Sequence, residues 1–295
     1  MLAGKPLVMH PILACKKIPD LLQIVLIGFY PKEEMESLDT AFLSREVGVP
    51  VTYLQEEGGG HGSAGGLYQF KETLLQGNPK FIFVLNADVC SDCPLTEMLT
   101  FHKAHAGSAT MLVKEVDAQS ARDHGEAVLE TYQGGGKVLH YAEKPTTLVS
   151  STVNCGIYVF AAPGIFETIR DLLSQSLAFA KDPIHHSLAD ASISDKNNPA
   201  KTAKWRKDAS HASLQPKLGM PEVFSALAEK KSLYAYETKG FWRVLKTPGS
   251  SLKFSELYLS QMGSKLAQAR AKLKGGPAIE GNVYIHPGMY SASSS

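Results

Sequence analysis

A short apolar run that stops at a carboxylate does most to limit how this chain can fold. Residues 81–88 read FIFVLNAD, so five consecutive apolar residues are followed closely by Asp88. Such a run is typical of a strand buried on both faces of a parallel sheet. Ligands of open α/β sheets bind beyond the carboxyl ends of such strands, which makes Asp88 a candidate metal or phosphate-site residue. The alternative interpretation is that Asp88 or Ser91 caps a helix beginning near Pro94.

Strand-like and helix-like segments alternate around this run. Strands are expected at residues 23–30, 51–55, 81–86, 109–115, 138–142, 153–160 and 232–236. Helices are expected at residues 31–46, 67–75, 95–105, 221–228 and 252–273, the last with an apolar side that includes Leu252. This alternation predicts one continuous α/β domain with a mostly parallel sheet covered by helices on both faces. The strands at 138–142 and 153–160 are expected to form a pair flanking the loop 143–145, and residues 178–217 to form a polar insertion.

The composition excludes several classes of partner. The chain has 295 residues, 44% of them hydrophobic, which is enough for a large core. Thirty basic and twenty-nine acidic residues give a net charge of +1, so the charge balance carries no footprint of nucleic-acid or membrane binding. The sequence has neither a long apolar span nor a signal-peptide pattern at Met1, and we therefore expect a cytoplasmic location.

The cysteines and histidines give weak signals. Four cysteines are too few and too scattered for a disulfide framework, and the Cys90–Cys93 pair lacks the further ligands of a structural zinc site. His102 and His105 fall on one side of a predicted helix, away in sequence from any carboxylate cluster. We expect these two histidines on the solvated surface.

Several longer motifs occur in an order that resembles one enzyme family. They are VLNADVCSD from residue 84, the Glu143-Lys144-Pro145 loop, NCGIY from residue 154 and GNVYIHP from residue 281, together with LIGFY, YLQE and GGLYQF earlier in the chain. The order is that of the sugar-nucleotide pyrophosphorylases, with the closest resemblance to the alpha subunits of GDP-mannose pyrophosphorylases, over roughly residues 2–287. Each motif alone is weak, whereas several in register are specific.

The resemblance implies a fold and a domain plan. Residues 1–273 would form a Rossmann-like, GT-A-like nucleotidyltransferase domain with a mixed sheet flanked by helices. Residues 274–295 would contain the start of a left-handed β-helix built from hexapeptide repeats, of which only one partial rung is present.

The resemblance also assigns roles to individual residues. Asp88 would bind Mg²⁺. Glu143 and Lys144 would contact the sugar and its phosphate, Gly125 would offer its backbone amide to the sugar, and Asn154 would bind a sugar hydroxyl. The nucleotide would be bordered by Gln55, Glu56, Gly62 and Gly65. A cation and a lysine suit this chemistry because two charged phosphates must be brought together.

Simpler interpretations stay open for these residues. Glu143 and Lys144 could form a solvated loop with a weak ion pair, Asn154 could make a strand-start hydrogen bond, and residues 62–66 could form a plain flexible turn. Tyr158 is expected in the core. Because Lys144 precedes a proline, we expect it in an extended conformation with its amine reaching outward.

Two departures from the family pattern bear on catalysis. The family's first strand, its Gly-Gly-x-Gly-Thr-Arg loop and its Pro-Lys-Pro segment have no counterpart, and Lys5 is no convincing substitute. Without that strand, the neighbouring strands are expected to be left with unpaired backbone groups. Val244 stands where catalytic members carry the carboxylate of Trp-x-Asp, and an aliphatic side chain cannot bind Mg²⁺.

Taken together, the motifs imply a subunit that binds GDP-mannose and regulates a catalytic beta subunit, with catalysis impaired. Two alternatives remain: an active mannose-1-phosphate guanylyltransferase that makes GDP-mannose from GTP and mannose-1-phosphate, and a truncated chain without independent function. Neither nucleic acid nor a membrane is an expected partner.

Overall fold

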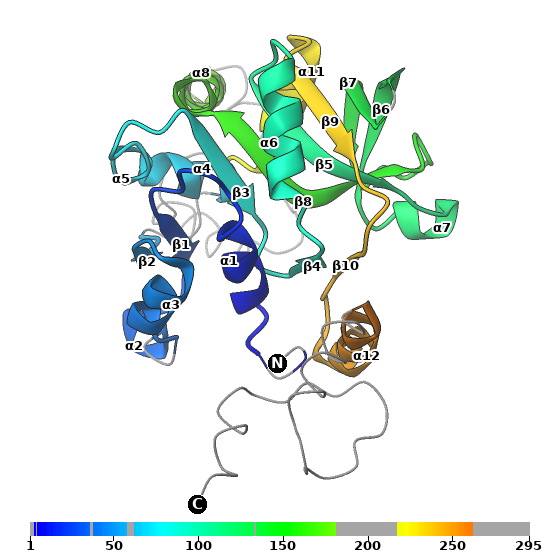
Figure 1. Cartoon of the computed structure of the whole chain (residues 1–295). Coiled ribbons are helices and arrows are strands. Elements are labelled where there is room, and N and C mark those ends of the chain that lie inside the picture. Colours follow the sequence, from blue (N-terminus) through cyan, green and yellow to red (C-terminus); the bar gives the residue numbers. More distant parts are fainter. Residues whose placement is uncertain are drawn as a thin grey trace, which may run out of the picture.

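A computed structural model describes residues 3, 5–35, 38–57, 62–132, 134–180 and 217–261 of the chain (Figure 1). Most of the expected polar insertion and all of residues 274–295 lie outside the described residues. The part of the helix expected at 252–273 that follows Gln261 lies outside them as well.

The main sheet in the described part of the chain has six strands. Their order across the sheet is β3 (Phe81–Leu85), β8 (Thr152–Ala161), β5 (Ala109–Glu115), β9 (Leu233–Glu237), β7 (Gly135–Glu143) and β6 (Gly125–Tyr132). Among the described pairings of this sheet, β5 and β9 are parallel and the others are antiparallel. The expectation of a mostly parallel sheet is therefore wrong, and the sheet is mixed.

One of the antiparallel pairings is a hairpin that the sequence pattern did not reveal. The strand β6 was not expected, and it pairs with β7 over its whole length, from Gly125 opposite Glu143 to Tyr132 opposite Gly135. Two strands joined by so short a connection must run antiparallel. The other edge of β7 pairs with β9, and β8 lies between β3 and β5, so the expected pairing of β7 with β8 is also wrong.

Two smaller sheets complete the strand pattern. Strands β1 (Ile24–Gly28) and β2 (Val51–Gln55) form a parallel pair, and β4 (Val89–Ser91) pairs antiparallel with β10 (Trp242–Val244). In the described ranges, β1 pairs with β2 alone and β3 with β8 alone. All five residues of β1 are only partly buried. One backbone edge of each of these apolar strands thus lacks a described strand partner.

Helices cover both faces of the main sheet (Figure 1). On one face, α6 (Leu95–Ala104) and α1 (Met9–Cys15) contribute to a core with alternate residues of β8, including Val153, Ile157 and Val159. On the other face, α4 (Gly62–Gln69), α8 (Ala162–Ala180) and α11 (Met220–Glu229) pack with the residues of β8 that point the opposite way, Tyr158 and Phe160. The period-two alternation of β8 therefore joins both halves of the core.

Further helices complete the described fold. They are α2 (Lys32–Met35), α3 (Thr40–Val47), α5 (Lys71–Leu74), α7 (Ala118–Ala121), the 3-10 turn η1 (Pro248–Ser250) and α12 (Ser251–Gln261). The helix expected at 31–46 is split in two because the Asp39 side chain accepts a hydrogen bond from Phe42 N at 2.7 Å and starts α3 afresh. Leu252, expected on the apolar side of its helix, is 82% exposed.

His102 and His105 are not on the solvated surface as expected. His102 is 3% exposed, and the rings of both histidines pack against aromatic side chains, His105 being stacked on Tyr234 with ring centroids 3.9 Å apart. Their Nδ1 and Nε2 atoms, respectively, lie within hydrogen-bond distance of the buried Thr110 hydroxyl. The helix face that carries them is turned toward the sheet.

The four cysteines are free and buried, so the structure forms no disulfide with them. Burial raises the pKa of the Cys15 and Cys90 thiols to about 12, which keeps both protonated. Within the described residues, no helix is long and apolar enough to cross a bilayer, and no group of three His, Cys, Asp or Glu side chains could hold a metal ion.

Candidate functional site

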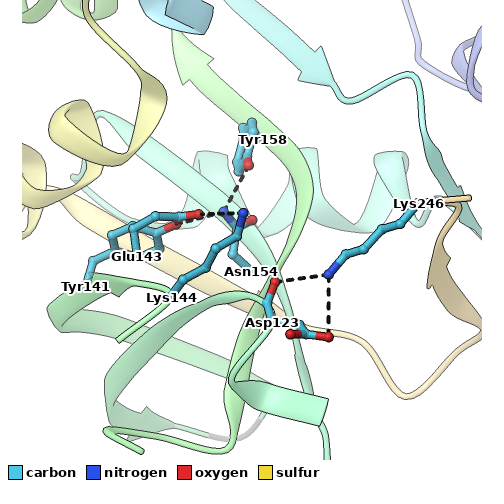
Figure 2. A network of polar contacts seen from close by, with 7 residues as sticks. All are labelled: Asp123, Tyr141, Glu143, Lys144, Asn154, Tyr158 and Lys246. Carbon is cyan, nitrogen blue, oxygen red and sulfur yellow. Dashed lines mark hydrogen bonds and ion pairs between the residues drawn. The ribbon is translucent and has the colours of Figure 1, made fainter. Parts of the chain in front are cut away.

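The predicted sugar and phosphate residues Glu143, Lys144 and Asn154 come together at the end of β7 (Figure 2). The hydroxyl of Tyr141 donates to Glu143 Oε2 at 2.6 Å and accepts a hydrogen bond from Asn154 Nδ2 at 3.2 Å. Burial raises the pKa of Tyr141, and the hydrogen bond to Glu143 raises it further, so the phenol stays protonated and remains a donor. Tyr141 thus connects Glu143 of β7 to Asn154 of β8.

The side chain of Asn154 is fully oriented by its neighbours. Its Nδ2 also donates to the Tyr158 hydroxyl at 3.0 Å, and its Oδ1 accepts from Gly156 N at 2.9 Å. Both amide hydrogens are therefore engaged, because an Asn side chain has two donors. In this arrangement the second lone pair of Asn154 Oδ1 could accept a hydrogen bond from a ligand.

The position of Gly125 has no room for a side chain. It lies opposite Glu143 in the β6–β7 ladder, and a Cβ atom at this position would clash with the Tyr141 hydroxyl and lie 2.7 Å from Glu143 Oε2. Only a glycine leaves room for the hydrogen bond between Tyr141 and Glu143. The structure therefore brings Gly125 into the same cluster as Glu143 and Asn154.

Lys144 differs from its expected conformation. Its φ is +43°, in the left-handed region, whereas the following proline led us to expect an extended residue. Its backbone N–H donates to His124 O at 3.3 Å, which holds the chain in a tight turn as it leaves β7. The Lys144 ammonium lies 4.0 Å from Glu143 Oε1, with the two side chains 63% and 38% exposed, so this ion pair is weak.

Asp88 lies just beyond the end of β3, on the surface. Neither Asp88 nor Ser91 caps a helix. The N-cap residue of α6 is Pro94, no side chain accepts a hydrogen bond there, and Ser91 Oγ accepts from Cys93 N at 3.2 Å. The capping alternative is therefore wrong for Asp88.

Val244 lies close to Asp88 along the paired backbones of β10 and β4. Val244 pairs with Val89 in the β10–β4 ladder, and Leu245 N donates to the carbonyl of Asp88 at 2.9 Å. The position that would complete a two-carboxylate metal site is thus close to Asp88 and holds an aliphatic side chain. The described residues near Asp88 do not form a three-ligand metal site.

Three of the predicted nucleotide residues, Glu56, Gly62 and Gly65, lie at the start of α4, while Gln55 ends β2 opposite Gly28 of β1. Glu56 follows β2, and a Cβ atom on Gly66 would clash with its side chain, so the Glu56 carboxylate lies against α4. Gly62, with φ +78°, begins α4 and packs on the carbonyl of Leu218. That carbonyl accepts from both Ala64 N and Gly65 N at 3.1 Å.

Residues 62–66 are therefore the first turn of a helix and not the plain flexible turn of the alternative interpretation. The amide of Gly65 is already engaged by the protein. In return, Ser63 Oγ accepts from Met220 N at 3.0 Å, so the first turns of α4 and α11 cap each other.

The helix α11 joins the two groups. It begins beside the first turn of α4, and its Phe224 side chain, 1% exposed, packs against the rings of Tyr141 and Tyr158 with centroids 5.3 and 4.7 Å away. The helix α11 therefore contacts both groups of predicted site residues.

Sequence reasoning missed three contributors. Tyr141 lies two residues before Glu143, and the period-two alternation of a strand places both on one face, which was the available signal. Tyr158 is buried as expected, but its hydroxyl also belongs to the network. Lys246 donates to the carbonyl of Asp123 at 3.1 Å, just before Gly125 in the chain (Figure 2).

The cavities found on the described part of the chain lie away from the predicted site residues. Two open cavities of about 410 and 280 Å³ lie along the connection from β9 to β10 and share Lys114 and Lys239 in their linings. None of the predicted site residues lines either of them.

Comparison with known proteins agrees with this architecture. A family model described as nucleotidyl transferase matches residues 1–206, which is more than half of the chain. The chain belongs to the nucleotidyl transferase family. It is 37% identical over 286 residues to mannose-1-phosphate guanyltransferase alpha-A of Xenopus laevis, and 36% identical over 289 residues to mannose-1-phosphate guanylyltransferase regulatory subunit alpha of Homo sapiens. Each alignment covers 97% of this chain and 62% of the relative, so the chain spans about three-fifths of the length of these relatives.

Solved structures support the fold. A Bacillus anthracis protein described as a glucose-1-phosphate thymidylyltransferase superposes with a TM-score of 0.59 at 16% identity, covering 88% of this chain and 84% of that one. UDP-glucose pyrophosphorylase in complex with UDP-glucose gives a TM-score of 0.54 at 15% identity, covering 86% and 85%. The expected nucleotidyltransferase fold with a mixed sheet and flanking helices is confirmed, while the β-helix lies outside the described residues.

Proposed function

We propose that this nucleotidyl transferase chain is an alpha-type subunit that binds GDP-mannose and regulates a catalytic beta subunit without efficient catalysis of its own. The observation that carries the proposal is the position of Val244 beside Asp88. Support comes also from relatives named as mannose-1-phosphate guanylyltransferase alpha and regulatory subunits.

The reaction of the catalytic relatives would explain why one missing carboxylate matters. A phosphate oxygen of mannose-1-phosphate attacks the α-phosphorus of GTP, and pyrophosphate leaves. Stabilising the developing charge requires positioned cations, and each such group contributes on the order of 10²–10³ in rate. At position 244, close to Asp88 along the backbone, this chain carries an aliphatic side chain where the catalytic relatives would carry a second carboxylate for the metal.

Binding makes smaller demands than catalysis. Mg²⁺ is often held by one or two carboxylates together with ligand phosphates, so Asp88 fits a metal bound chiefly through a diphosphate. Such an ion would neutralise charge on the ligand when bound. Glu143, held by Tyr141, can accept a hydrogen bond from a sugar hydroxyl, and Lys144 can move away from Glu143 toward a phosphate because their ion pair is exposed.

Calorimetric titration of the full chain with GDP-mannose tests the binding proposal. We expect saturable binding that weakens by about 1.5–3 kcal/mol in Lys144→Ala, the range for a hydrogen bond to a charged group. Absence of GDP-mannose binding to a chain that melts cooperatively would contradict the proposal. Unchanged affinity in Lys144→Ala would leave this lysine as an ordinary solvated residue.

The regulatory part concerns a second chain. We expect the chain to co-purify with a catalytic beta subunit, and GDP-mannose to change the activity of that complex. A beta subunit whose activity is the same with and without this chain, at saturating GDP-mannose, would rule out the regulatory role.

A further inference from the structure

We propose that Lys246 binds the diphosphate of the nucleotide directly and so supplies positive charge at the place where Val244 removes a metal ligand. This inference rests on the proposed binding of a sugar nucleotide. It assigns to Lys246 a role that Mg²⁺ would otherwise fill alone, namely neutralising phosphate oxygens beside Asp88.

The strand β10 fixes where Lys246 leaves the sheet. Trp242 is 3% exposed, and its indole N–H donates to Cys155 O at 2.9 Å, which anchors β10 to β8. Two residues before Lys246, Val244 pairs with Val89, and Leu245 N donates to the carbonyl of Asp88. Lys246 is therefore the next residue along the chain from a backbone contact with the candidate metal ligand.

The Lys246 side chain points across to the residues that precede Gly125 (Figure 2). Its Nζ donates to Asp123 O at 3.1 Å and lies 3.9 Å from Asp123 Oδ2. The Lys246 and Asp123 side chains are 48% and 78% exposed, so the ion pair between them contributes little to stability. Exchange of this partner for a phosphate oxygen would cost little.

Lys144 reaches the same short segment from the other direction. Its backbone N–H donates to His124 O, and its side chain approaches the cluster from the side opposite to Lys246 in Figure 2. The pKa of His124 is lowered mainly by burial, then by the charge of Lys246, with a further contribution from Lys144, while Asp123 and Glu143 oppose the shift. Both ammonium groups are thus within electrostatic reach of one imidazole ring.

Two ammonium groups on either side of residues 123–125 suit one class of ligand. A lysine offers three donors and one positive charge, and phosphate oxygens are strong acceptors that carry negative charge. The sugar cluster lies on the Lys144 side of this segment, and Asp88 lies on the Lys246 side. A diphosphate that links a sugar to a nucleoside would contact both lysines, with Lys144 nearer to the sugar.

The test is a comparison of two lysine variants of the full chain. Lys246→Met and Lys230→Met remove one positive charge each, and Lys230 is an exposed residue just after α11. Calorimetric titrations with GDP-mannose and with GDP are run in EDTA and in Mg²⁺. The melting temperatures of both variants are expected to match that of the wild type, because exposed charge pairs contribute little.

We expect Lys246→Met to weaken GDP-mannose and GDP to the same extent, by about 10- to 100-fold, because both ligands carry the diphosphate. The loss should be larger in EDTA than in Mg²⁺, and Lys230→Met should leave both affinities unchanged. Equal affinities of Lys246→Met and wild type, or a loss that Lys230→Met reproduces, would overturn the proposal. So would a loss confined to GDP-mannose, which would place Lys246 at the sugar.

The same titrations separate this inference from the proposed function. A wild-type chain that binds GDP but not GDP-mannose contradicts the sugar-nucleotide function. The role of Lys246 is then tested by comparing the GDP affinities of Lys246→Met and the wild type. A wild-type chain that binds neither ligand overturns both proposals.

Discussion

The Tyr141 hydroxyl donates to Glu143 Oε2 across 2.6 Å and at the same time accepts from Asn154 Nδ2. One buried hydroxyl thus sets the orientation of two candidate sugar-binding side chains that come from different strands. The second oxygen of Glu143, Oε1, lies 4.0 Å from the exposed Lys144 ammonium. This leaves one carboxylate oxygen in position to accept a hydrogen bond from a ligand.

Replacing Tyr141 by phenylalanine should therefore weaken the sugar contact and spare the nucleotide contact. In Tyr141→Phe we expect GDP-mannose affinity to fall by about 1–2 kcal/mol while GDP affinity is unchanged, because only GDP-mannose carries the sugar. Calorimetry on both ligands measures the difference.

A double-mutant cycle with Glu143→Gln checks whether Tyr141 acts through Glu143. If it does, Tyr141→Phe costs little further affinity in the Glu143→Gln background. Additive losses would show that Tyr141 supports binding by another route, such as general stability.

Gly125 should tolerate no side chain. A Cβ atom in Gly125→Ala would displace Tyr141 or Glu143 from their hydrogen bond, so we expect a lower melting temperature and loss of GDP-mannose binding. Gly164→Ala is the matched control: Gly164 lies in α8, and an added Cβ there meets no atom within 4 Å. That substitution should keep binding and stabilise the fold by up to about 1 kcal/mol. Equal behaviour of the two variants would contradict the packing described here.

The buried histidine pair predicts an acid-sensitive fold. Gly107 N donates to His105 Nδ1 at 3.0 Å, so that nitrogen carries no proton, and His105 Nε2 must donate to the Thr110 hydroxyl at 2.7 Å. The Thr110 hydroxyl then donates to His102 Nδ1 at 2.9 Å. Both imidazoles are therefore neutral in the folded protein.

Burial lowers the pKa of His102 to about 4, and burial together with the charge of His102 lowers the pKa of His105 to about 4. In the unfolded chain both titrate near 6.5, so as the pH falls the unfolded state takes up protons first. The free energy of unfolding should thus be highest above pH 6.5 and decrease between about pH 6.5 and 4. Imidazole NMR signals of His102 and His105 that titrate near pH 6.5 in the folded protein would refute this assignment.

The sequence predicted well where periodicity is local. The apolar run before Asp88 is a strand, β8 lies where its alternation placed it, and the family motifs led to Glu143, Gly125 and Asn154, which the fold brings together. The two strands could be predicted because alternation and strand ends are encoded within a few residues. The site residues came from the family motifs, and their roles stay predictions.

Pairing and conformation were harder to predict. The partner of β7 is the hairpin strand β6, and strand pairing depends on contacts that no local window contains. The left-handed Lys144 follows from the His124 carbonyl that holds its amide, and the buried His102 follows from which helix face meets the sheet. Tyr141 was overlooked because a strand tyrosine is usually part of the core, and burial alone does not distinguish the two roles.

Restoring a carboxylate should change the response to metal. In Val244→Asp a second carboxylate is added at a position whose backbone lies close to that of Asp88, since residue 244 pairs with Val89 and Leu245 N bonds to the Asp88 carbonyl. We expect GDP-mannose binding to become more dependent on Mg²⁺, with affinity lowered in EDTA by repulsion between the two carboxylates and recovered when Mg²⁺ is added. Val244→Asn, which adds an uncharged polar group of the same shape, serves as the control. A Val244→Asp chain whose Mg²⁺ dependence equals that of Val244→Asn would show that the two positions do not share a metal.

The central claim, that this chain binds a sugar nucleotide without making it, is tested most directly by the rate of GDP-mannose formation. The purified full chain is incubated with saturating GTP, mannose-1-phosphate and Mg²⁺, and GDP-mannose is measured over time. With Val244 in place of a carboxylate, we predict turnover several powers of ten below that of an ordinary enzyme. Turnover of about 10 per second by the chain alone would contradict the account and identify it as an active guanylyltransferase.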